Sequence, residues 1–448
     1  MMSPQQARDK VEQLVERARR AGADGADALC IGDSMDNVSV RMGELEDVSR
    51  SESEKFGLRV FVGQRSASVA SSDLSADAMD ALVTRALAMA AEAPEDQFAG
   101  LAPAAMLDKG PFADLDGWDD TDPDPAALKD RALIAEKAAL GVAGVTNSSG
   151  CGAAAMSASV ALATSNGFSG AYRSTGRSCS ASVIAGEGGG MERDYAWHSA
   201  RHLDDLEKPA DIGRRAGERA AARLNPVKID AGRIAVLFDP RIATTLLGHF
   251  IAAITGSSVA RKSSFLHDKL GAQVFAPGIA IHDDPLRKRG LRSRAFDSEG
   301  LAVRPMALVE DGKLKTWLAE SASARQLGIA PTGHAVRGIG GAPGAGPSNL
   351  YLAAGTATVD DLRARFPRCI LVTELIGQGV NGVTGDYSRG AAGFLIEHGE
   401  TVGPLAEITI ASNLVEMFAT LEPANDLAFR RGVDSPTLLV PEMMVASA

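Results

Sequence analysis

The spacing of apolar residues predicts helices that alternate with strand-rich segments along the first half of the chain. After Ser3-Pro4, apolar side chains recur at helical spacing from Ala7 to Ala18, which predicts a capped helix that ends near Gly22. Helical periodicity returns in three further segments, at 75–93, 125–142 and 208–223. The remaining segments, 28–71 and 145–188, are rich in Val, Ile, Ser and Gly and predict short antiparallel strands joined by turns.

The second half of the chain shows fewer helical patterns and more short strands. Asn225-Pro226 breaks the preceding helix and is our candidate domain boundary. Beyond it, an apolar strand at 233–240 leads into an apolar stretch, and Glu310-Asp311-Gly312 suits a hairpin turn. A further strand is expected to run into a helix capped by Ser412 or Asn413.

These patterns predict an α+β fold with two domains. We expect residues 1–226 to form an N-terminal α/β domain with antiparallel strands and helices, and residues 227–448 to form a C-terminal, mainly β domain. The length of 448 residues suits more than one domain.

Composition and charge narrow the class of protein. Hydrophobic residues make up 45% and charged residues 23%, the mixture of a folded globular chain. The formal net charge of −11 repels phosphate backbones and disfavours nucleic acid as a partner. No apolar run is long enough for a membrane helix and the first residues do not resemble a signal peptide, so we expect a cytoplasmic protein without membrane contact. The four cysteines are far apart and predict reduced thiols.

The common catalytic signatures do not occur in the sequence. It contains no GxSxG elbow, no GxxxxGK[ST] phosphate loop and no HExxH zinc helix. The glycine-rich segment 338–346 lacks the lysine of a phosphate loop, which favours a surface loop. The acidic segment 108–125 fails the spacing of a calcium loop at Trp118, which favours a solvated turn.

The histidines offer no complete set of metal ligands. His198 and His202 have the four-residue spacing of a zinc helix, but no third ligand is near, so surface or strand placement is favoured. The segment His282-Asp283-Asp284 precedes a proline and predicts a polar turn. His249 lies in an apolar segment, where a hydrogen-bonded structural histidine is the expectation.

A basic cluster stands out against the acidic average. A solvated loop is the favoured interpretation, and a grip on a peptide carboxylate or an acidic partner is the alternative. The cluster consists of Arg287, Lys288, Arg289, Arg292 and Arg294.

The most informative segment is 372–400, where glycine recurs every two to five residues. Such density in a strand context implies bulges or a backbone that another group approaches closely. Two interpretations stay open: a groove that receives an extended peptide by strand addition, or a tightly bent sheet corner. The candidate groove residues are Gly377, Gly379, Asp386, Tyr387, Ser388 and Arg389.

Several long motifs, in a consistent order, resemble a known family. The chain is similar to the TldD/PmbA family, and within it to the PmbA, or TldE, branch, most densely from about residue 235 to 445. The motifs are FDSEG at 296–300, ARKSSFLHDKLG at 260–271, TGHA at 332–335, VTELIGQGVNGVTGDYSRGAAGF from 372, and AEITIASNL with VPEM near the end.

The resemblance implies a specific function. TldD and TldE are similar to each other and pair as a heterodimeric cytosolic zinc peptidase that acts on short or unfolded peptides. In the TldD branch, two histidines of an HExxxH helix and a distant cysteine near the C-terminus hold the zinc, and the glutamate serves as base.

This chain departs from that pattern at each ligand position. In the matching segment LLGHFIAAI, Gly248 and Ala253 stand where the two histidines would be, and His249 stands where the glutamate would be. No cysteine follows Cys369 to supply the third ligand. Because a catalytic zinc needs about three protein ligands and an open position, we expect no metal in this chain.

The resemblance therefore predicts a non-catalytic TldE-like subunit with no cofactor of its own. Zinc is expected in a TldD-type partner, and this chain is expected to pair with that partner, or to form a homodimer when alone. One alternative is an independent homodimeric hydrolase that uses Asp386, Tyr387 and Arg389. Another is a peptide-binding scaffold protein.

Overall fold

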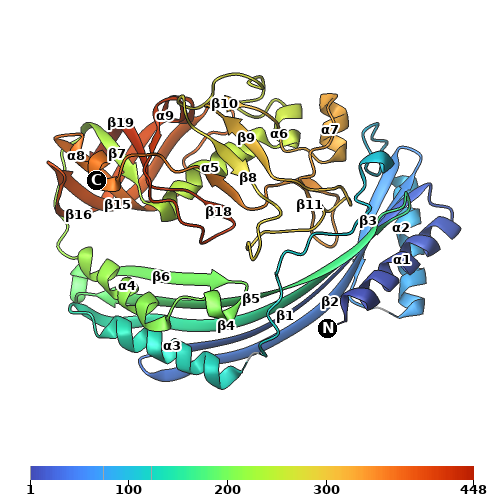
Figure 1. Cartoon of the computed structure of the whole chain (residues 1–448), viewed down its shortest axis with the longest axis horizontal. Coiled ribbons are helices and arrows are strands. Elements are labelled where there is room, and N and C mark those ends of the chain that lie inside the picture. Colours follow the sequence, from blue (N-terminus) through green and yellow to red (C-terminus); the bar gives the residue numbers. More distant parts are fainter. Residues whose placement is uncertain (1, 74, 123, 448) are drawn as a thin grey trace.

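The first half of the molecule is built on one long, curved sheet. The computed structural model describes residues 2–73, 75–122 and 124–447. Within these residues the sheet has six strands, and every neighbouring pair is antiparallel (Figure 1). From one edge to the other, the strands are β3 (Arg65–Ser71), β2 (Glu44–Val62), β1 (Gly25–Arg41), β4 (Val145–Thr164), β5 (Ser169–Ala185) and β6 (Glu192–Ala200).

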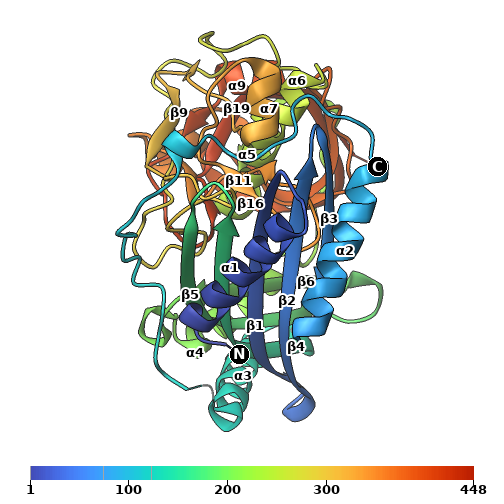
Figure 2. The ribbon, with the colours of Figure 1, turned by 90° about the vertical axis from the view of Figure 1, so that its right-hand side faces the viewer.

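Helices cover one face of this sheet at both of its ends. Figure 2 shows α1 (Pro4–Arg20) lying over β1 and β4, and α2 (Ala76–Glu92) lying over β2 and β3. At the other end, α3 (Pro125–Leu140) and α4 (Pro209–Ala222) pack on β4, β5 and β6. Cys30 and Val40 of β1 contribute to the apolar clusters under these helices, whereas Leu29 turns to the opposite face, as the strand period of two requires.

The predicted helices are confirmed, but the predicted strand lengths are wrong. The Ser3 hydroxyl accepts the amide of Gln6, and the Gln6 side chain accepts the amide of Ser3, which forms the expected cap of α1. The segments expected to form several short strands instead form strands of 17 to 20 residues, apart from the shorter β3 and β6. Charged residues suggested turns, but the 44–52 part of β2 is exposed, so these side chains reach solvent without a break in the strand.

The second half contains a mixed sheet that closes on itself. In its described residues the strand order is β16 (Glu400–Asn413), β15 (Asp386–Glu397), β14 (Arg368–Ile376), β7 (Gly232–Phe238), β19 (Leu438–Ser447) and β17 (Glu422–Pro423). β16 also pairs with β19, which closes the ring. The apolar side of α5 (Pro240–Ile254) shares one buried cluster with these strands and with α9 (Leu414–Thr420). Asn413 caps α9, as predicted.

Smaller elements complete the second half. One further sheet has the order β10 (Lys313–Leu314), β9 (Met306–Glu310), β8 (Ile281–Asp283), β13 (Leu350–Leu352) and β18 (Val433–Asp434). The remaining elements are the pair β11 (Ala335–Val336) and β12 (Gly344–Ala345), the helices α6 (Gly256–Ala260), α7 (Ser321–Leu327) and α8 (Val359–Ala364), and the 3₁₀ turns η1 (Ala104–Met106), η2 (Gly188–Gly190) and η3 (Leu203–Asp205). The predicted hairpin is confirmed, because Asp311 and Gly312 join β9 to β10 with φ of 50° and 73°.

The two halves meet along the face of the long sheet that the helices leave open. The rings of Phe168 and Phe296 lie 4.8 Å apart at this contact. Asp27 of β1 accepts a hydrogen bond from Arg59 of β2 at 2.8 Å and a second one from Arg337 of the other half. All three charged side chains are buried, so the ion pairs connect the halves inside the protein.

The observed architecture confirms the α+β class. Strands β1 to β6 precede residue 226 and the closed sheet follows it, while the division of the chain at residue 226 stays a prediction. Among the described helices, none has the length and apolarity required to cross a bilayer.

Candidate functional site

Helix α5 carries the positions at which the family resemblance places zinc ligands. Its start is fixed locally, because the Asp239 carboxylate accepts the amide of Arg241 at 2.9 Å and Pro240 occupies the first turn. From this start the helix runs to Ile254. Arg241 therefore lies at its N-terminal end, and Ala253 lies in its last turn.

The C-terminal end of α5 borders a cavity of about 260 Å³, which we call the histidine cavity. Segment 378–382 forms the opposite wall, and the amide of Phe265 holds this segment by donating to the Gly382 carbonyl at 3.0 Å. The lining residues are His249, Ala252, Ala253, Ser258, Ser263, Phe265, Gln378, Val380, Gly382, Arg389 and Leu414.

Two polar atoms, one at this cavity and one beside it, have no hydrogen-bond partner among the described residues. They are Nε2 of His249 and the hydroxyl oxygen of Tyr387, and both are buried. The two rings meet edge to face with centroids 6.1 Å apart. Burial lowers the pKa of His249, and the nearby Arg389 charge lowers it further. The expectation of a hydrogen-bonded His249 is therefore wrong for Nε2.

The residues of the histidine cavity do not fit a zinc ion. A side chain at Gly248 would meet no atom within 4 Å, so space is available there, but glycine supplies no donor. Ala253 offers only a methyl group. Across the described ranges, no group of three or more His, Cys, Asp or Glu side chains is placed to hold a metal. Burial raises the pKa of Cys369 to about 11, which keeps this thiol protonated.

The glycine-rich segment forms a bent loop whose backbone bonds are made within the chain. The amide of Ser388 donates to the Gly379 carbonyl at 2.6 Å, and a Cβ at Gly379 would overlap the Ser388 carbonyl oxygen. On its other side, the same stretch of β15 pairs with β16. Both edges at 386–389 are thus occupied, which favours the bent-corner interpretation there over strand addition.

The candidate groove residues separate in the structure. Arg389 lines the histidine cavity, whereas Tyr387 is buried. The Asp386 carboxylate accepts hydrogen bonds from Thr384 at 2.6 Å and Asn413 at 3.2 Å, and these bonds lower its pKa. Gly377 has a φ of 74° at the end of β14, and Ser388 is exposed. Their role in a peptide groove stays a prediction.

Sequence reasoning missed the lining residues Phe265, Gln378, Val380 and Gly382. Gln378, Val380 and Gly382 occupy every second position of the motif GQGVNG, and this alternation is the signal that could have identified one wall. Phe265 comes from a distant segment and carried no such signal.

Comparison with known proteins decides the family. Models described as PmbA/TldA metallopeptidase domain 1, central domain and C-terminal domain match residues 26–90, 118–224 and 231–447. The chain belongs to the PmbA/TldD metallopeptidase family. A relative in this family, the metalloprotease PmbA of Escherichia coli O157:H7, is 37% identical over 426 residues, which are 95% of this chain and 92% of that protein.

Solved structures agree with the family. A Bacteroides thetaiotaomicron protein, described as a candidate modulator of DNA gyrase, superimposes with a TM-score of 0.92 at 25% identity and covers 100% of both chains. TldE from Thermococcus kodakarensis gives a TM-score of 0.87 at 19% identity, over 98% of this chain and 100% of that one. This second likeness supports the PmbA/TldD fold alone.

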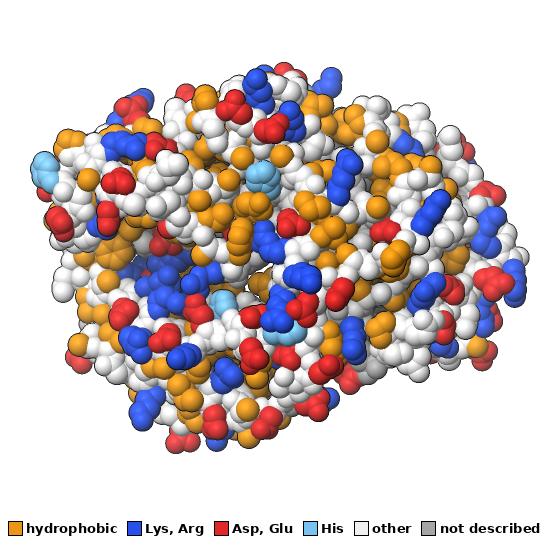
Figure 3. All heavy atoms as spheres, in the orientation of Figure 1, with side chains coloured by type: hydrophobic (Ala, Val, Ile, Leu, Met, Phe, Trp, Pro, Cys, Tyr) orange, Lys and Arg blue, Asp and Glu red, His pale blue; other side chains and the backbone are white. Residues whose placement is uncertain are grey.

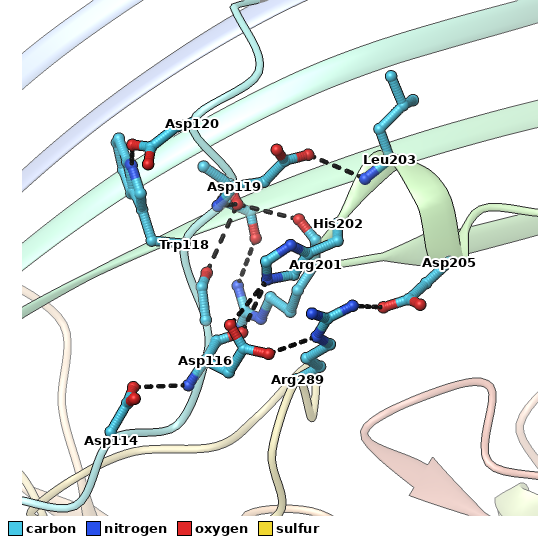
Figure 4. A network of polar contacts seen from close by, with 12 residues as sticks. Asp114, Asp116, Trp118, Asp119, Asp120, Arg201, His202, Leu203, Asp205 and Arg289 are labelled. Carbon is cyan, nitrogen blue, oxygen red and sulfur yellow. Dashed lines mark hydrogen bonds and ion pairs between the residues drawn. The ribbon is translucent and has the colours of Figure 1, made fainter.

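The acidic segment 108–125 contacts the basic cluster at a place away from the histidine cavity (Figure 4). Nε of Arg289 donates to the Asp116 carboxylate at 2.6 Å, and its Nη1 donates to Asp205 at 3.0 Å. The side chains of these contacts still reach solvent, which agrees with the predicted solvated segments. Arg294 departs from the prediction, because it is buried and donates to the Gly346 carbonyl at 3.0 Å.

The paired histidines do not share a helix face. His198 lies in β6, where Nδ1 accepts the amide of Glu207 at 3.1 Å. His202 follows the strand, and its Nε2 lies 2.9 Å from the carbonyl oxygen of Asp116. The favoured strand or surface placement is confirmed for His198.

The polar turn predicted at 282–284 is wrong for its first two residues. His282 and Asp283 belong to β8, and Asp283 is buried. Its carboxylate accepts the amide and the hydroxyl of Ser348, each at 2.7 Å, and lies 3.3 Å from Nε2 of His334. The glycine-rich segment 338–346 is a largely exposed loop that ends at β12, as expected.

Proposed function

We propose that this chain is a PmbA/TldE-type subunit of a TldD/TldE-type heterodimeric zinc metallopeptidase that acts on short or unfolded peptides. In this proposal the chain is cytoplasmic and non-catalytic, it holds no cofactor, and the TldD-type partner carries the zinc. The chain stabilises that partner and shapes one wall of a shared chamber.

The observation that carries the proposal is the histidine cavity. The helix, the bent loop at 377–385 and the space between them are all present, yet Gly248 and Ala253 supply no electron pair. His249 is a weak base because burial lowers its pKa. A family scaffold with this cavity but without metal donors suits a companion subunit better than a catalytic one.

The alternative hydrolase finds less support in the same residues. The Asp386 carboxylate is engaged with Thr384 and Asn413, and burial raises the pKa of Tyr387, so neither group is primed as base or nucleophile. Tyr387 and Arg389 do not join Asp386 around one cavity. Zinc bound stoichiometrically to this chain would nonetheless favour the hydrolase. A stand-alone scaffold protein would bind peptides without enhancing any partner's cleavage.

Reconstitution with a TldD-type protein from the same organism tests the proposal. Each chain is purified alone and after co-expression, and cleavage of an unfolded peptide is followed by mass spectrometry with and without a chelator. We expect the two chains to co-purify and to cleave together, with chelator-sensitive activity. Hydrolysis by this chain alone, or full activity of the partner without it and no co-purification, would reject the proposal.

A further inference from the structure

A second cavity, of about 320 Å³, lies at the N-terminal end of α5, where the two halves of the chain meet. We call it the arginine cavity. β6 and α4 supply one side, and the start of α5 and the segment 426–435 supply the other. Figure 3 shows Lys and Arg side chains gathered in a hollow in this part of the surface. Its charged lining residues are Arg215, Arg219, Arg241, Arg430, Arg431, Asp239, Asp426 and Asp434.

Three arginines of the cavity are fixed by acidic partners behind the wall. Arg241 donates to both oxygens of Asp194, at 2.6 and 3.3 Å. Arg215 and Arg430 share the carboxylate of Glu207. Their guanidinium groups are thus held in place by ion pairs that link α4 to the segment 426–435 and β6 to α5.

The hydrogen bonds of the lining aspartates go mainly to backbone and hydroxyl groups. Asp239 caps α5. Asp426 accepts the amide and hydroxyl of Thr437 at 2.8 and 2.7 Å, and Asp434 accepts the amides of Arg430 and Arg431 at 3.0 and 2.9 Å. These carboxylates therefore neutralise only part of the positive charge of the arginines.

Arg219 is the clearest case of a lining arginine whose charge is not balanced by an ion pair. Its side chain donates to the Tyr195 carbonyl at 3.2 Å, and in the described part of the chain no carboxylate lies within the 4.0 Å of an ion pair. Arg219 is half-buried. Burial, followed by the nearby Arg241 charge, lowers its pKa, so an anion that entered the cavity would relieve this repulsion.

The uncharged part of the cavity lining suits a peptide. Tyr195, Trp197, Pro240 and Ala428 provide apolar and aromatic surface beside the arginines, and Arg431 lies over the Trp197 ring at 5.2 Å. The space is close to the lower limit of about 300 Å³ for small-molecule sites. A few peptide atoms fit such a space, whereas a nucleic-acid duplex does not, and the net charge of −11 repels a phosphate backbone.

We propose that the arginine cavity binds a carboxylate of a peptide, with Arg219 as its principal donor and the Tyr195–Trp197 wall against the peptide chain. The carboxylate comes from an acidic side chain or from the peptide C-terminus, and both present the same planar group to the guanidinium fork. This inference rests on the proposed function in taking a peptide as the ligand.

Calorimetric titration of the purified full chain tests the inference with N-acetylated hexapeptides. One peptide carries glutamates and a C-terminal amide, a second is neutral with a free C-terminus, and a third is neutral and amidated. We expect saturable binding of the first or the second peptide, and the one that binds identifies the source of the carboxylate. The R219Q variant should bind about tenfold more weakly or worse, while R219K should fall between the two.

Arg214 on the same helix supplies the matched control. It is exposed and pairs with Asp211 at 3.3 Å, so R214Q should change the affinity by less than about twofold. Circular dichroism melting would show that both variants fold. Equal binding by R219Q and the unmodified chain, equal binding of the third peptide, or absence of saturable binding would overturn the inference.

Tighter binding of a short single-stranded oligonucleotide than of any peptide would also overturn it. Because the titration uses this chain alone and the proposed function is tested by cleavage with a partner, the two can fail separately.

Discussion

The two ends of α5 open into cavities of different chemical character. Thr244 borders the arginine cavity and Ala252 borders the histidine cavity, which places these positions about 12 Å apart along the helix axis. The first cavity holds more positive than negative side chains. The second is lined by the single cation Arg389, by apolar and uncharged polar side chains, and by His249, whose buried Nε2 has no hydrogen-bond partner among the described residues. One helix thus combines a charged wall supported by ion pairs with a wall that lacks a complete set of metal ligands.

Removing Asp194 should give the largest effect, because it tests whether the arginine cavity is held by buried ion pairs. Asp194 is 3% exposed and binds Arg241, with Arg223 3.7 Å away. The D194A substitution removes both hydrogen bonds that the buried Arg241 guanidinium makes to this carboxylate and leaves it only Asp239 at 3.6 Å, so the free energy of unfolding should fall by about 3 kcal/mol in urea denaturation. The exposed pair at Asp211 is the control, and D211A should cost less than about 1 kcal/mol. Similar losses of unfolding free energy in D194A and D211A would contradict the view that buried ion pairs hold the arginine cavity together.

A smaller effect is expected at the bent loop that walls the histidine cavity. The G379A substitution would drive a methyl group into the Ser388 carbonyl and should destabilise the protein by about 2 kcal/mol or more. Gly382 lies in the same loop with open space around it, so G382A should be nearly neutral. Chemical denaturation of both variants measures the difference, and tolerance of G379A would show that the loop is not closely packed.

Replacing His249 should have a smaller effect and the opposite sign. Its buried Nε2 has no described partner, so H249F should leave stability unchanged or raise it by up to about 1 kcal/mol. Because the folded-state pKa of His249 is lowered, the unfolded state binds more protons below about pH 6.5 and stability falls as the pH falls. H249F should reduce this loss between pH 7 and pH 5 in thermal melts. An unchanged pH dependence would indicate that other groups cause it.

The smallest expected effect is at Gly248. This glycine is exposed within α5 and a side chain there meets open space, so G248A should stabilise the protein by about 0.5 to 1 kcal/mol. Thermal melts in the absence of metal would measure the shift. Destabilisation by G248A would mean that neighbouring atoms restrict this position, contrary to the open space found around it.

Local sequence signals predicted much of the fold. Ser3-Pro4 with its apolar periodicity marked α1, Asp311-Gly312 marked a hairpin, and Asn413 marked the start of α9. Each of these features depends on residues close together in the chain. The long strands β1 and β2 were misjudged because charged residues mark turns in many proteins but occupy exposed strand positions here.

The sites were harder to predict because they combine distant segments. Arg289 reaches Asp116 across 173 residues, and no pattern near either residue reveals the pair. The arginine cavity likewise brings Arg219 of α4 together with Arg431 of the last segment. Local patterns showed only that Gly248 and Ala253 lack donors, whereas the cavity beside them required the folded chain.

Zinc content of the purified chain tests the central claim most directly. The chain is expressed alone in zinc-supplemented medium, dialysed, and measured by inductively coupled plasma mass spectrometry, with the reconstituted pair measured in parallel. The account predicts zinc far below one equivalent per chain for this subunit and close to one equivalent for the pair. One tightly held zinc on the isolated chain, removed by a chelator together with peptide cleavage, would contradict the account.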